Sequence, residues 1–299
     1  MVKVICAHAG AWNTKNQEAI AAEKQAVLEA ISNCDSNENI LNMAMQAIEY
    51  LENHPNLDAG YGSILQMDGV ARTDAAIATN DVNSKKSYAA VLQLENIKNS
   101  SKIARRLLEY GYHSVLSGTH ALQFAKEEGF QIESLITEAR KQSYLSQLEE
   151  FGLSEGQVPK YKDLAVNQAA LDAKKLSTVG VVAADTESGL LYAISSTGGL
   201  YYGYPGRVGD SGIFGQGIYV DKNIAAVCTG EGDKIIQRMT AMRVSLYYEQ
   251  TSNIQKACEM AIADLKDNQN GEGGIIAITC NGEVGIAHNT SFLATSTCR

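Results

Sequence analysis

The run TVGVVAAD at residues 178–185 is apolar and rich in β-branched residues, and a Glu-Ser-Gly turn separates it from a second apolar run at 190–195. This composition favours two strands joined as a hairpin. The same arrangement recurs near the end of the chain, where an Asn-Gly turn separates residues 274–280 from residues 283–287. Two hairpins in the second half of the chain predict antiparallel sheets.

Helical patterns surround these hairpins. Apolar residues recur at helical spacing in 18–31 and 39–51, and further helices are predicted at 101–110, 120–128, 132–149, 234–250 and 254–267. Additional strands are predicted at 2–8, 63–67 and 87–94, with a loop at 9–11. Strands in hairpins and helices in blocks favour an α+β fold with helices covering antiparallel sheets, rather than βαβ units around a parallel sheet.

Composition limits the classes of protein to consider. The chain has 299 residues, of which 45% are hydrophobic and 20% charged, so it suits one large domain or two. Residues 150–177 lack sustained periodicity and are interpreted as a mobile linker. The net charge of −9 argues against a broad basic surface for nucleic acid, and no apolar run approaches the roughly 18 residues of a membrane span.

The first residues and the cysteines favour a cytoplasmic location. The opening apolar run is shorter than the hydrophobic region of a signal peptide. The six cysteines lie far apart, without a C-x-x-C pair, and are expected to be free and mostly buried. Because the histidines also lack an H-E-x-x-H spacing, no zinc site and no catalytic cofactor are expected.

Three loops rich in small residues are candidates for a binding site, at 195–199, 206–212 and 229–233. Each alone is explained by an ordinary turn. Together they carry Arg207 and Asp210, a guanidinium and a carboxylate that suit the carboxylate and ammonium of a small zwitterion. The last loop precedes a predicted helix, so its N–H groups are placed to face an oxyanion.

Thr178 has two interpretations. The first is a β-branched residue at the start of a strand. The second is a nucleophile, since cleavage before Thr178 creates an N-terminal threonine whose own α-amine, with a pKa of roughly 7.7–8.0, serves as its base. The sequence Gly209-Asp210-Ser211-Gly212 also resembles the nucleophile segment of trypsin-like proteases, but the Ala-Ala-His-Cys context of their histidine is absent.

Four ordered motifs resemble the plant-type asparaginase and isoaspartyl aminopeptidase family of N-terminal nucleophile hydrolases, which also includes glycosylasparaginases and threonine aspartase. The matching segments are Thr178-Val179-Gly180, Ser196-Thr197-Gly198-Gly199, Gly206 to Ser211 and Thr229 to Gly232. The resemblance extends along most of the chain, with further matches at His8 to Ala11, Ile97-Lys98-Asn99 with Ala104-Arg105, and Gly273 to Ala277.

The resemblance implies a four-layer αββα sandwich with two central antiparallel sheets. Residues 1–299 are then a single domain, made as a precursor that cleaves itself between Ser177 and Thr178. The products are an α chain, 1–177, whose tail is the linker 150–177, and a β chain, 178–299. Family members pair as homodimers of processed units, so a homodimer is expected.

The resemblance also implies a role for each site residue. Thr178 is the nucleophile and forms an acyl-enzyme, Thr197 hydrogen-bonds its hydroxyl, and Thr229 with Gly230 forms the oxyanion hole. The residues implied in substrate binding are Arg207 for the α-carboxylate, Asp210 and the Gly232 carbonyl for the α-ammonium, Thr229, Gly230 and Asp58. The expected reaction releases L-aspartate from asparagine or from isoaspartyl dipeptides.

Residues 51–61 resemble the family's sodium-binding loop, in which backbone carbonyls surround the ion. The implied ligands are the carbonyl oxygens of Leu51, Glu52, His54, Leu57, Ala59 and Tyr61. A purely structural turn is the alternative.

The chain departs from the family pattern at several positions. Ala9 replaces a glycine and Trp12 a small residue, which predicts a bulkier loop beside the nucleophile; Asp58 replaces asparagine, and Ser177 stands where glycine or aspartate is common. The Met-Asp-Gly that follows Asp74-Ala75-Ala76-Ile77 in the family is also absent. Two alternatives therefore stay open, a glycosylasparaginase of the same fold and an aspartate-binding relative that does not process itself.

Overall fold

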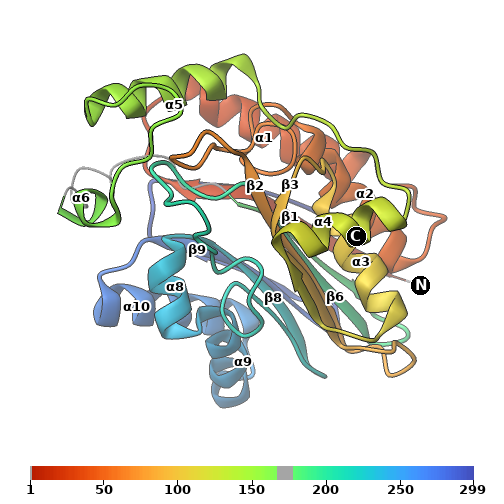
Figure 1. Ribbon diagram of the computed structural model, residues 1–299. Helices are drawn as coiled ribbons and strands as arrows, with labels where there is room; N and C mark the ends of the chain where they lie inside the picture. The colour runs from red at the N-terminus through yellow and green to blue at the C-terminus, as the bar shows by residue number, and fades with distance from the viewer. Residues whose placement is uncertain (1, 167–177) are drawn as a thin grey trace.

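The computed structural model describes residues 2–166 and 178–299, which form two β-sheets and flanking helices (Figure 1). Within these ranges, the large sheet has the order β11 (Phe292–Cys298), β1 (Lys3–Trp12), β5 (Val179–Asp185), β6 (Leu190–Thr197), β2 (Arg72–Thr79), β3 (Tyr88–Glu95) and β4 (Val115–Ser117). The small sheet has the order β10 (Val284–His288), β9 (Gly273–Thr279), β8 (Ile224–Gly230) and β7 (Ile218–Val220).

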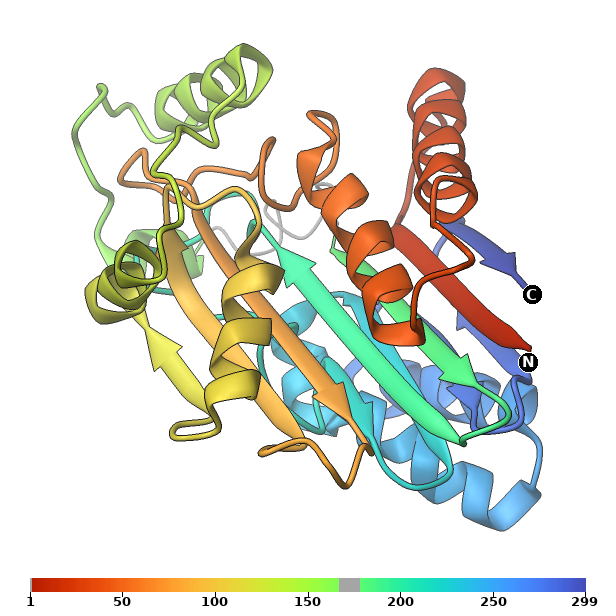
Figure 2. The ribbon, with the colours of Figure 1, turned by 90° about the vertical axis from the view of Figure 1, so that its right-hand side faces the viewer.

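Both predicted hairpins are confirmed. Strands β5 and β6 pair antiparallel from Val179 opposite Ser196 to Asp185 opposite Leu190, and β9 pairs with β10. Figure 2 shows β5 and β6 in the middle of the large sheet, between β1 and β2. The prediction of antiparallel sheets needs one correction, because within residues 2–166 and 178–299 β3 and β4 run parallel.

Helices lie on the outer side of each sheet (Figure 1). Those that contact the large sheet are α1 (Gln17–Ser32), α2 (Ile40–Asn53), α3 (Ser100–Tyr110) and α4 (Gly118–Glu127). Those beside the small sheet are α8 (Gly232–Arg238), α9 (Thr240–Thr251) and α10 (Ile254–Gln269). The remaining described helices are α5 (Glu138–Glu150) and α6 (Tyr161–Val166).

The alternation of side chains along β5 explains its continuous apolar sequence. Val181 and Ala183 belong to the core between the large sheet and its helices, whereas Val182 and Ala184 belong to a second core that includes Val227 of the small sheet. Successive strand residues point to opposite faces, so a strand covered on both faces needs apolar residues throughout. The two sheets therefore pack against each other through β5 and its neighbours.

Two predicted helices have different limits in the structure. The helix predicted at 234–250 is interrupted at Met239, whose φ of 50° is left-handed and separates α8 from α9. The helix predicted at 132–149 begins only at Glu138, where Thr137 accepts a hydrogen bond from the backbone N–H of Arg140 and caps the first turn.

Three other predictions are wrong in part. Residues 9–11 belong to β1, with a shift of register toward β11, rather than to a loop. The strand predicted at 63–67 is reduced to an isolated bridge between Leu65 and Ala71. The predicted linker contains α6, whose Leu164 is buried beside α5, and its residues 167–177 lie outside the described residues.

All six cysteines are free, as predicted. Three of them are buried and three are partly exposed, so burial is less complete than expected: Cys6, Cys228 and Cys258 are buried, and Cys34, Cys280 and Cys298 are partly exposed. Across residues 2–166 and 178–299, no helix combines the length and apolar character needed to cross a bilayer.

Strand β10 forms one edge of the small sheet, and a side chain covers part of it. The amide of Gln255, on α10, donates to the carbonyl of Ile286 (2.8 Å) and accepts from the N–H of the same residue (3.0 Å). One side-chain amide thus satisfies both backbone groups of Ile286 in the way that a neighbouring strand does.

Candidate active site

A small pocket lies where the beginning of β5 meets the ends of β6 and β8. Because β6 runs antiparallel to β5, the pairing of Ser196 with Val179 places Thr197 beside Thr178. The pocket has a volume of about 10 Å³, space for about one water molecule. Its lining residues are Thr178, Thr197, Gly199, Leu200, Arg207, Gly209, Asp210, Ser211, Gly230 and Gly232.

The hydroxyl of Thr178 lies among other hydroxyls. It donates to Oγ1 of Thr197 over 3.2 Å, and Oγ of Ser211 lies 3.4 Å away. The Thr197 oxygen also accepts the N–H of Gly199. All three hydroxyl residues are buried, so the polar groups that surround Thr178 are fixed by the fold. Ser211 is the last residue of the matching segment Gly206 to Ser211, but its contact with Thr178 was not predicted.

Thr229 and Gly230 end β8 on the other side of the pocket. The Thr229 hydroxyl accepts the N–H of Ala11 (3.3 Å), and an accepting hydroxyl still has its own proton to donate. Gly230 has a φ of 135°, and a Cβ there would lie 2.4 Å from the carbonyl oxygen of Glu272. Only glycine therefore fits this strand end.

Arg207 and Asp210 supply a pair of opposite charges at the pocket. Arg207 Nη2 donates to Asp233 over 2.9 Å, but its buried Nε has no hydrogen-bond partner among the described residues. Asp210 is 4% exposed, and its Oδ2 likewise has no partner within the described ranges. Burial raises the pKa of Asp210 to about 7, and the charge of Arg207 acts in the opposite direction. The pocket thus holds one unpaired donor and one unpaired acceptor.

Gly232 lets the backbone come close to this charged pair. A Cβ at Gly232 would lie 2.6 Å from Asp210 Oδ1 and 2.9 Å from Arg207 Nη2. The predicted site residues Thr178, Thr197, Arg207, Asp210, Gly230 and Gly232 therefore share one pocket, and Thr229 adjoins it.

Asp58 lies behind the pocket rather than in its lining. Its carboxylate accepts the N–H of Ile64 (2.9 Å), and its carbonyl accepts the N–H of Gly198 (2.9 Å). Asp58 therefore holds the segment next to Thr197 in place. Trp12 also points away from the pocket, because its indole donates to Glu23 on α1 (3.0 Å).

His8 is a buried neighbour of the nucleophile strand that received no role in the sequence analysis. It pairs with Gly180 across β1 and β5, and a Cβ on Gly180 would lie 2.4 Å from His8 Nε2. Burial lowers the pKa of His8 to about 3, against an opposing hydrogen bond with the backbone of Thr178. The imidazole is therefore neutral at ordinary pH.

The residues implied in sodium binding lie in the last turn of α2 and in the loop that follows it, and they offer backbone carbonyl oxygens. Three of the six implied carbonyls already accept one backbone hydrogen bond, those of Leu51, Glu52 and His54. A carbonyl oxygen has a second lone pair, and oxygen ligands suit a hard cation. Within residues 2–166 and 178–299, no cluster of three or more His, Cys, Asp or Glu side chains is arranged to hold a metal ion.

The Glu52 side chain is fully buried. It accepts hydrogen bonds from the hydroxyls of Ser101 (2.7 Å) and Ser196 (2.7 Å), and burial raises its pKa. Because Ser196 precedes Thr197, this carboxyl group connects α2 and α3 to the strand that carries the second threonine.

The fold and the pocket define a mixed α+β protein whose candidate site combines a buried strand-initial threonine with an arginine–aspartate pair. A family model described as asparaginase matches residues 1–298, and the chain belongs to this family. Isoaspartyl peptidase/L-asparaginase of Mus musculus is 34% identical over 241 residues, which cover 79% of this chain and 68% of the relative. Plant-type L-asparaginase of Pyrococcus furiosus is 32% identical over 299 residues, covering 98% and 95%. Isoaspartyl peptidase/L-asparaginase of Bos taurus is 32% identical over 296 residues, covering 95% and 89%.

Proposed function

We propose that the protein is a self-cleaving threonine hydrolase that releases L-aspartate from asparagine and from isoaspartyl dipeptides. The names of its relatives, plant-type L-asparaginase and isoaspartyl peptidase/L-asparaginase, support this substrate class. Under this proposal residues 1–299 are one N-terminal nucleophile domain with four αββα layers. The observation that carries the proposal is the shared pocket of Thr178, Arg207 and Asp210.

Self-cleavage creates the catalytic group. The Thr178 oxygen attacks the carbonyl carbon of Ser177, and the proton of the hydroxyl passes to the departing Thr178 nitrogen as the peptide bond breaks. Water then hydrolyses the resulting ester, which frees the Ser177 carboxylate and the Thr178 hydroxyl. The products are chains 1–177 and 178–299, and the second begins with a threonine whose amine and hydroxyl are close enough for proton transfer.

The free amine then acts as the base for substrate hydrolysis. It takes the hydroxyl proton as the Thr178 oxygen attacks the side-chain carbonyl of the substrate, and the proton goes to the leaving amine. The Thr229 hydroxyl and the Gly230 N–H stabilise the oxyanion, an effect of about 3–4 kcal/mol per donor in comparable sites. Water cleaves the Thr178 acyl-enzyme and releases L-aspartate, and Thr197 orients the hydroxyl throughout.

The unpaired charges of the pocket suit the other end of the substrate. Arg207 Nε faces the α-carboxylate, and Asp210 Oδ2 with the Gly232 carbonyl holds the α-ammonium. Both side-chain atoms are buried without partners among the described residues, and leaving such atoms unpaired is costly. A bound zwitterion satisfies both at once. This correspondence supports an α-amino acid as the common part of all substrates.

Replacement of Arg207 by alanine is expected to weaken substrate binding. The Arg207→Ala variant loses hydrogen bonds to a charged group, about 1.5–3 kcal/mol, so KM is expected to rise roughly 10- to 150-fold. Steady-state kinetics with β-Asp-Leu measure the change. The matched control is Arg106→Ala, an exposed arginine paired with Glu109 and distant from the pocket. An unchanged KM in Arg207→Ala would contradict the carboxylate clamp.

Substrate binding is expected to improve as the pH rises through about 7, the pKa to which burial raises Asp210. Only the ionised carboxylate attracts the ammonium, so KM for β-Asp-Leu falls over this range.

The free energy of unfolding is expected to fall over the same range. The folded state holds the Asp210 proton at pH values where the unfolded state has lost it. This contribution to stability is therefore lost as the pH rises through about 7. KM profiles and urea unfolding from pH 5 to 9 measure both effects.

The control for this pH dependence is Asp210→Asn, which has no titrating group at the position. The difference in unfolding free energy between this variant and the wild type should move in favour of the variant as the pH rises from 5 to about 7, and it should stay constant above that pH. A difference that stays constant with pH would show that Asp210 does not titrate in this range.

Mass spectrometry of the purified chain tests the proposed function directly. Two fragments with masses for 1–177 and 178–299, together with release of aspartate, are expected. An intact chain that binds aspartate without turnover would identify a binding protein instead. Faster cleavage of a glycosylated asparagine than of β-Asp-Leu would identify a glycosylasparaginase.

The proposal includes three further properties. The carbonyls of the loop after α2 hold a structural sodium ion, which orders that loop and takes no part in the chemistry. The processed units pair as a homodimer, with neither nucleic acid nor membrane as a partner. The protein is cytoplasmic, which its six free cysteines support.

A further inference from the structure

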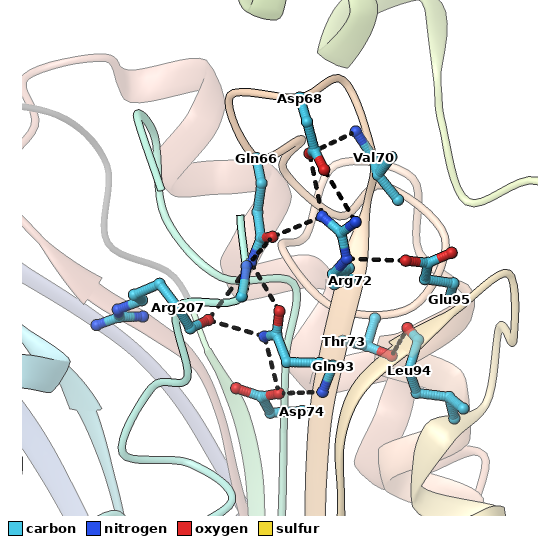
Figure 3. Close-up of polar contacts among 11 residues, drawn as sticks. Gln66, Asp68, Val70, Arg72, Thr73, Asp74, Gln93, Leu94, Glu95 and Arg207 are labelled. Carbon is cyan, nitrogen blue, oxygen red and sulfur yellow. Dashed lines mark hydrogen bonds and ion pairs between the residues drawn. The ribbon is translucent and has the colours of Figure 1, made fainter. Parts of the chain in front are cut away.

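A row of side-chain hydrogen bonds runs behind the loop that carries Arg207 (Figure 3). Arg72 Nη1 donates to Gln66 Oε1 (2.7 Å), and Gln66 Nε2 donates to Gln93 Oε1 (3.1 Å). Gln93 Nε2 then donates to the backbone carbonyl of Arg207 (2.8 Å) and contacts Asp74 Oδ1 (3.4 Å). The row therefore connects β2 and β3 to the proposed substrate clamp.

The two ends of the row fix the orientation of both amides. Arg72 has only donors. The Asp74 carboxylate accepts the N–H of Gln93 at one oxygen (2.7 Å) and the N–H of Gly209 at the other (3.1 Å). With a donor at one end and an acceptor at the other, Gln66 and Gln93 each have one amide orientation that satisfies all their groups.

The row holds the backbone on both sides of Arg207. Besides Gly209, the N–H of Gly206 donates to Gln66 Oε1 (3.0 Å), and the Arg207 carbonyl accepts from Gln93 and, over 3.4 Å, from Gln66. Figure 3 shows the Arg207 guanidinium pointing away from this row. The backbone that sets the direction of the side chain is therefore held at three of the four residues 206–209.

Gln93 has a backbone conformation that glutamine rarely adopts. Its φ is 54°, and it lies where the register between β2 and β3 shifts. Glycine adopts this conformation without strain and glutamine does not, so the strain at this position points to a use for the glutamine side chain. That side chain makes the hydrogen bonds to Gln66 and Arg207 described above.

We propose that Gln93 is a positioning residue that sets the place of Arg207 in the substrate pocket. This inference rests on the proposed function of Arg207 as the clamp for the α-carboxylate. Gln93 does not line the pocket, so it acts through the Arg207 carbonyl rather than on the substrate. A displaced guanidinium weakens binding of every substrate with an α-carboxylate, and it leaves the attack of Thr178 on its own chain unaffected.

The test compares Gln93→Gly with Asn96→Gly. Asn96 has a φ of 58° and follows the same strand, but it is exposed and lies outside the row. Both variants remove the strain of a left-handed backbone conformation at a non-glycine residue. Only Gln93→Gly also removes the side-chain hydrogen bonds to Gln66 and to the Arg207 carbonyl. For Gln93→Gly we expect KM for β-Asp-Leu to rise roughly 10-fold or more, as for a misplaced substrate-binding group, with kcat and the rate of self-cleavage within about twofold of wild type. Asn96→Gly should match the wild type in all three.

Two results would overturn the inference. One is a KM for Gln93→Gly equal to that of Asn96→Gly. The other is a parallel loss of self-cleavage, kcat and thermal stability in Gln93→Gly, which would show a general structural role.

Hydrogen exchange separates this inference from the proposed function. If the wild type neither cleaves itself nor hydrolyses substrate, the proposed function fails. The exchange rates of the Gly206 and Gly209 amides still report whether the hydrogen bonds of the row hold the backbone around Arg207. Faster exchange of these amides in Gln93→Gly than in Asn96→Gly supports the positioning role, whereas equal exchange refutes it.

Discussion

The Thr178→Ala variant is expected to remain a single chain of full length and to have no measurable hydrolase activity. Alanine keeps the backbone of the strand start but removes the oxygen atom that, under the proposed function, attacks both the Ser177 carbonyl and the substrate. Replacing the nucleophile of a hydrolase typically lowers kcat by about 10⁶-fold. Mass spectrometry over several days of incubation, followed by an aspartate-release assay, measures both losses.

Thr178→Ser is the matched control, because it keeps the hydroxyl and removes only the methyl group. We expect it to cleave itself and to turn over substrate more slowly than the wild type. If Thr178→Ala were cleaved at the same bond, or if it hydrolysed β-Asp-Leu at a comparable rate, Thr178 would not be the nucleophile. Unfolding of each variant by urea checks that the fold is intact.

Gly230→Ala is expected to have the second largest effect. The added Cβ would lie 2.4 Å from the Glu272 carbonyl oxygen, so the end of β8 must move. That movement displaces an N–H of the proposed oxyanion hole, whose loss typically lowers kcat by about 10²–10³-fold. Single-turnover kinetics with β-Asp-Leu measure the acylation step directly.

Gly189→Ala is the control for backbone strain alone. Gly189 has a φ of 72° in the turn between β5 and β6, and a Cβ there would contact nothing within 4 Å. It should lose some stability and keep the kcat of the wild type. A kcat for Gly230→Ala within a factor of two of the Gly189→Ala value would contradict the assignment of the oxyanion hole.

The parts of the fold that the sequence predicts are those with a strong local pattern. The hairpin of β5 and β6 has apolar strands and a short turn, and α1 and α2 have clear apolar faces, so each was found within two residues of its observed limits. Strands that depend on distant partners were missed. Among the described residues, five strands received no prediction: β2, β4, β7, β8 and β11. The alanine-rich sequence of β2 and β8 has little intrinsic preference for strand, and their pairing with β6 and β9 decides their structure.

The break at Met239 has a similar explanation. Neither glycine nor proline marks it, and the residues on both sides have helical spacing. In the structure the N–H groups of Ala241 and Met242 bond to the carbonyls of Gln216 and Gly215. Tertiary hydrogen bonds of this kind override the local pattern and start a new helix after Met239.

In the candidate site, too, residues within a local sequence motif could be predicted, and residues that depend on distant neighbours could not. Residues in contiguous motifs, such as Thr178, Arg207 and Asp210, could be predicted to share a site because the motif itself carries the signal, and they line one pocket. The positions of His8 and Gln93 near the pocket were not predicted, because they depend on what lies across the sheet from these residues. Gln93 has no local mark of its left-handed backbone, and its partners Gln66 and Arg207 are far away in the sequence.

The amide of Gln255 on the edge of the small sheet has a consequence for solubility. An exposed edge strand is a template on which another chain can add a strand and begin to aggregate. At Ile286 both backbone groups are already bonded to Gln255, so an incoming strand must first break two hydrogen bonds. The Gln255 side chain therefore opposes edge-to-edge pairing of β10 with another chain at Ile286.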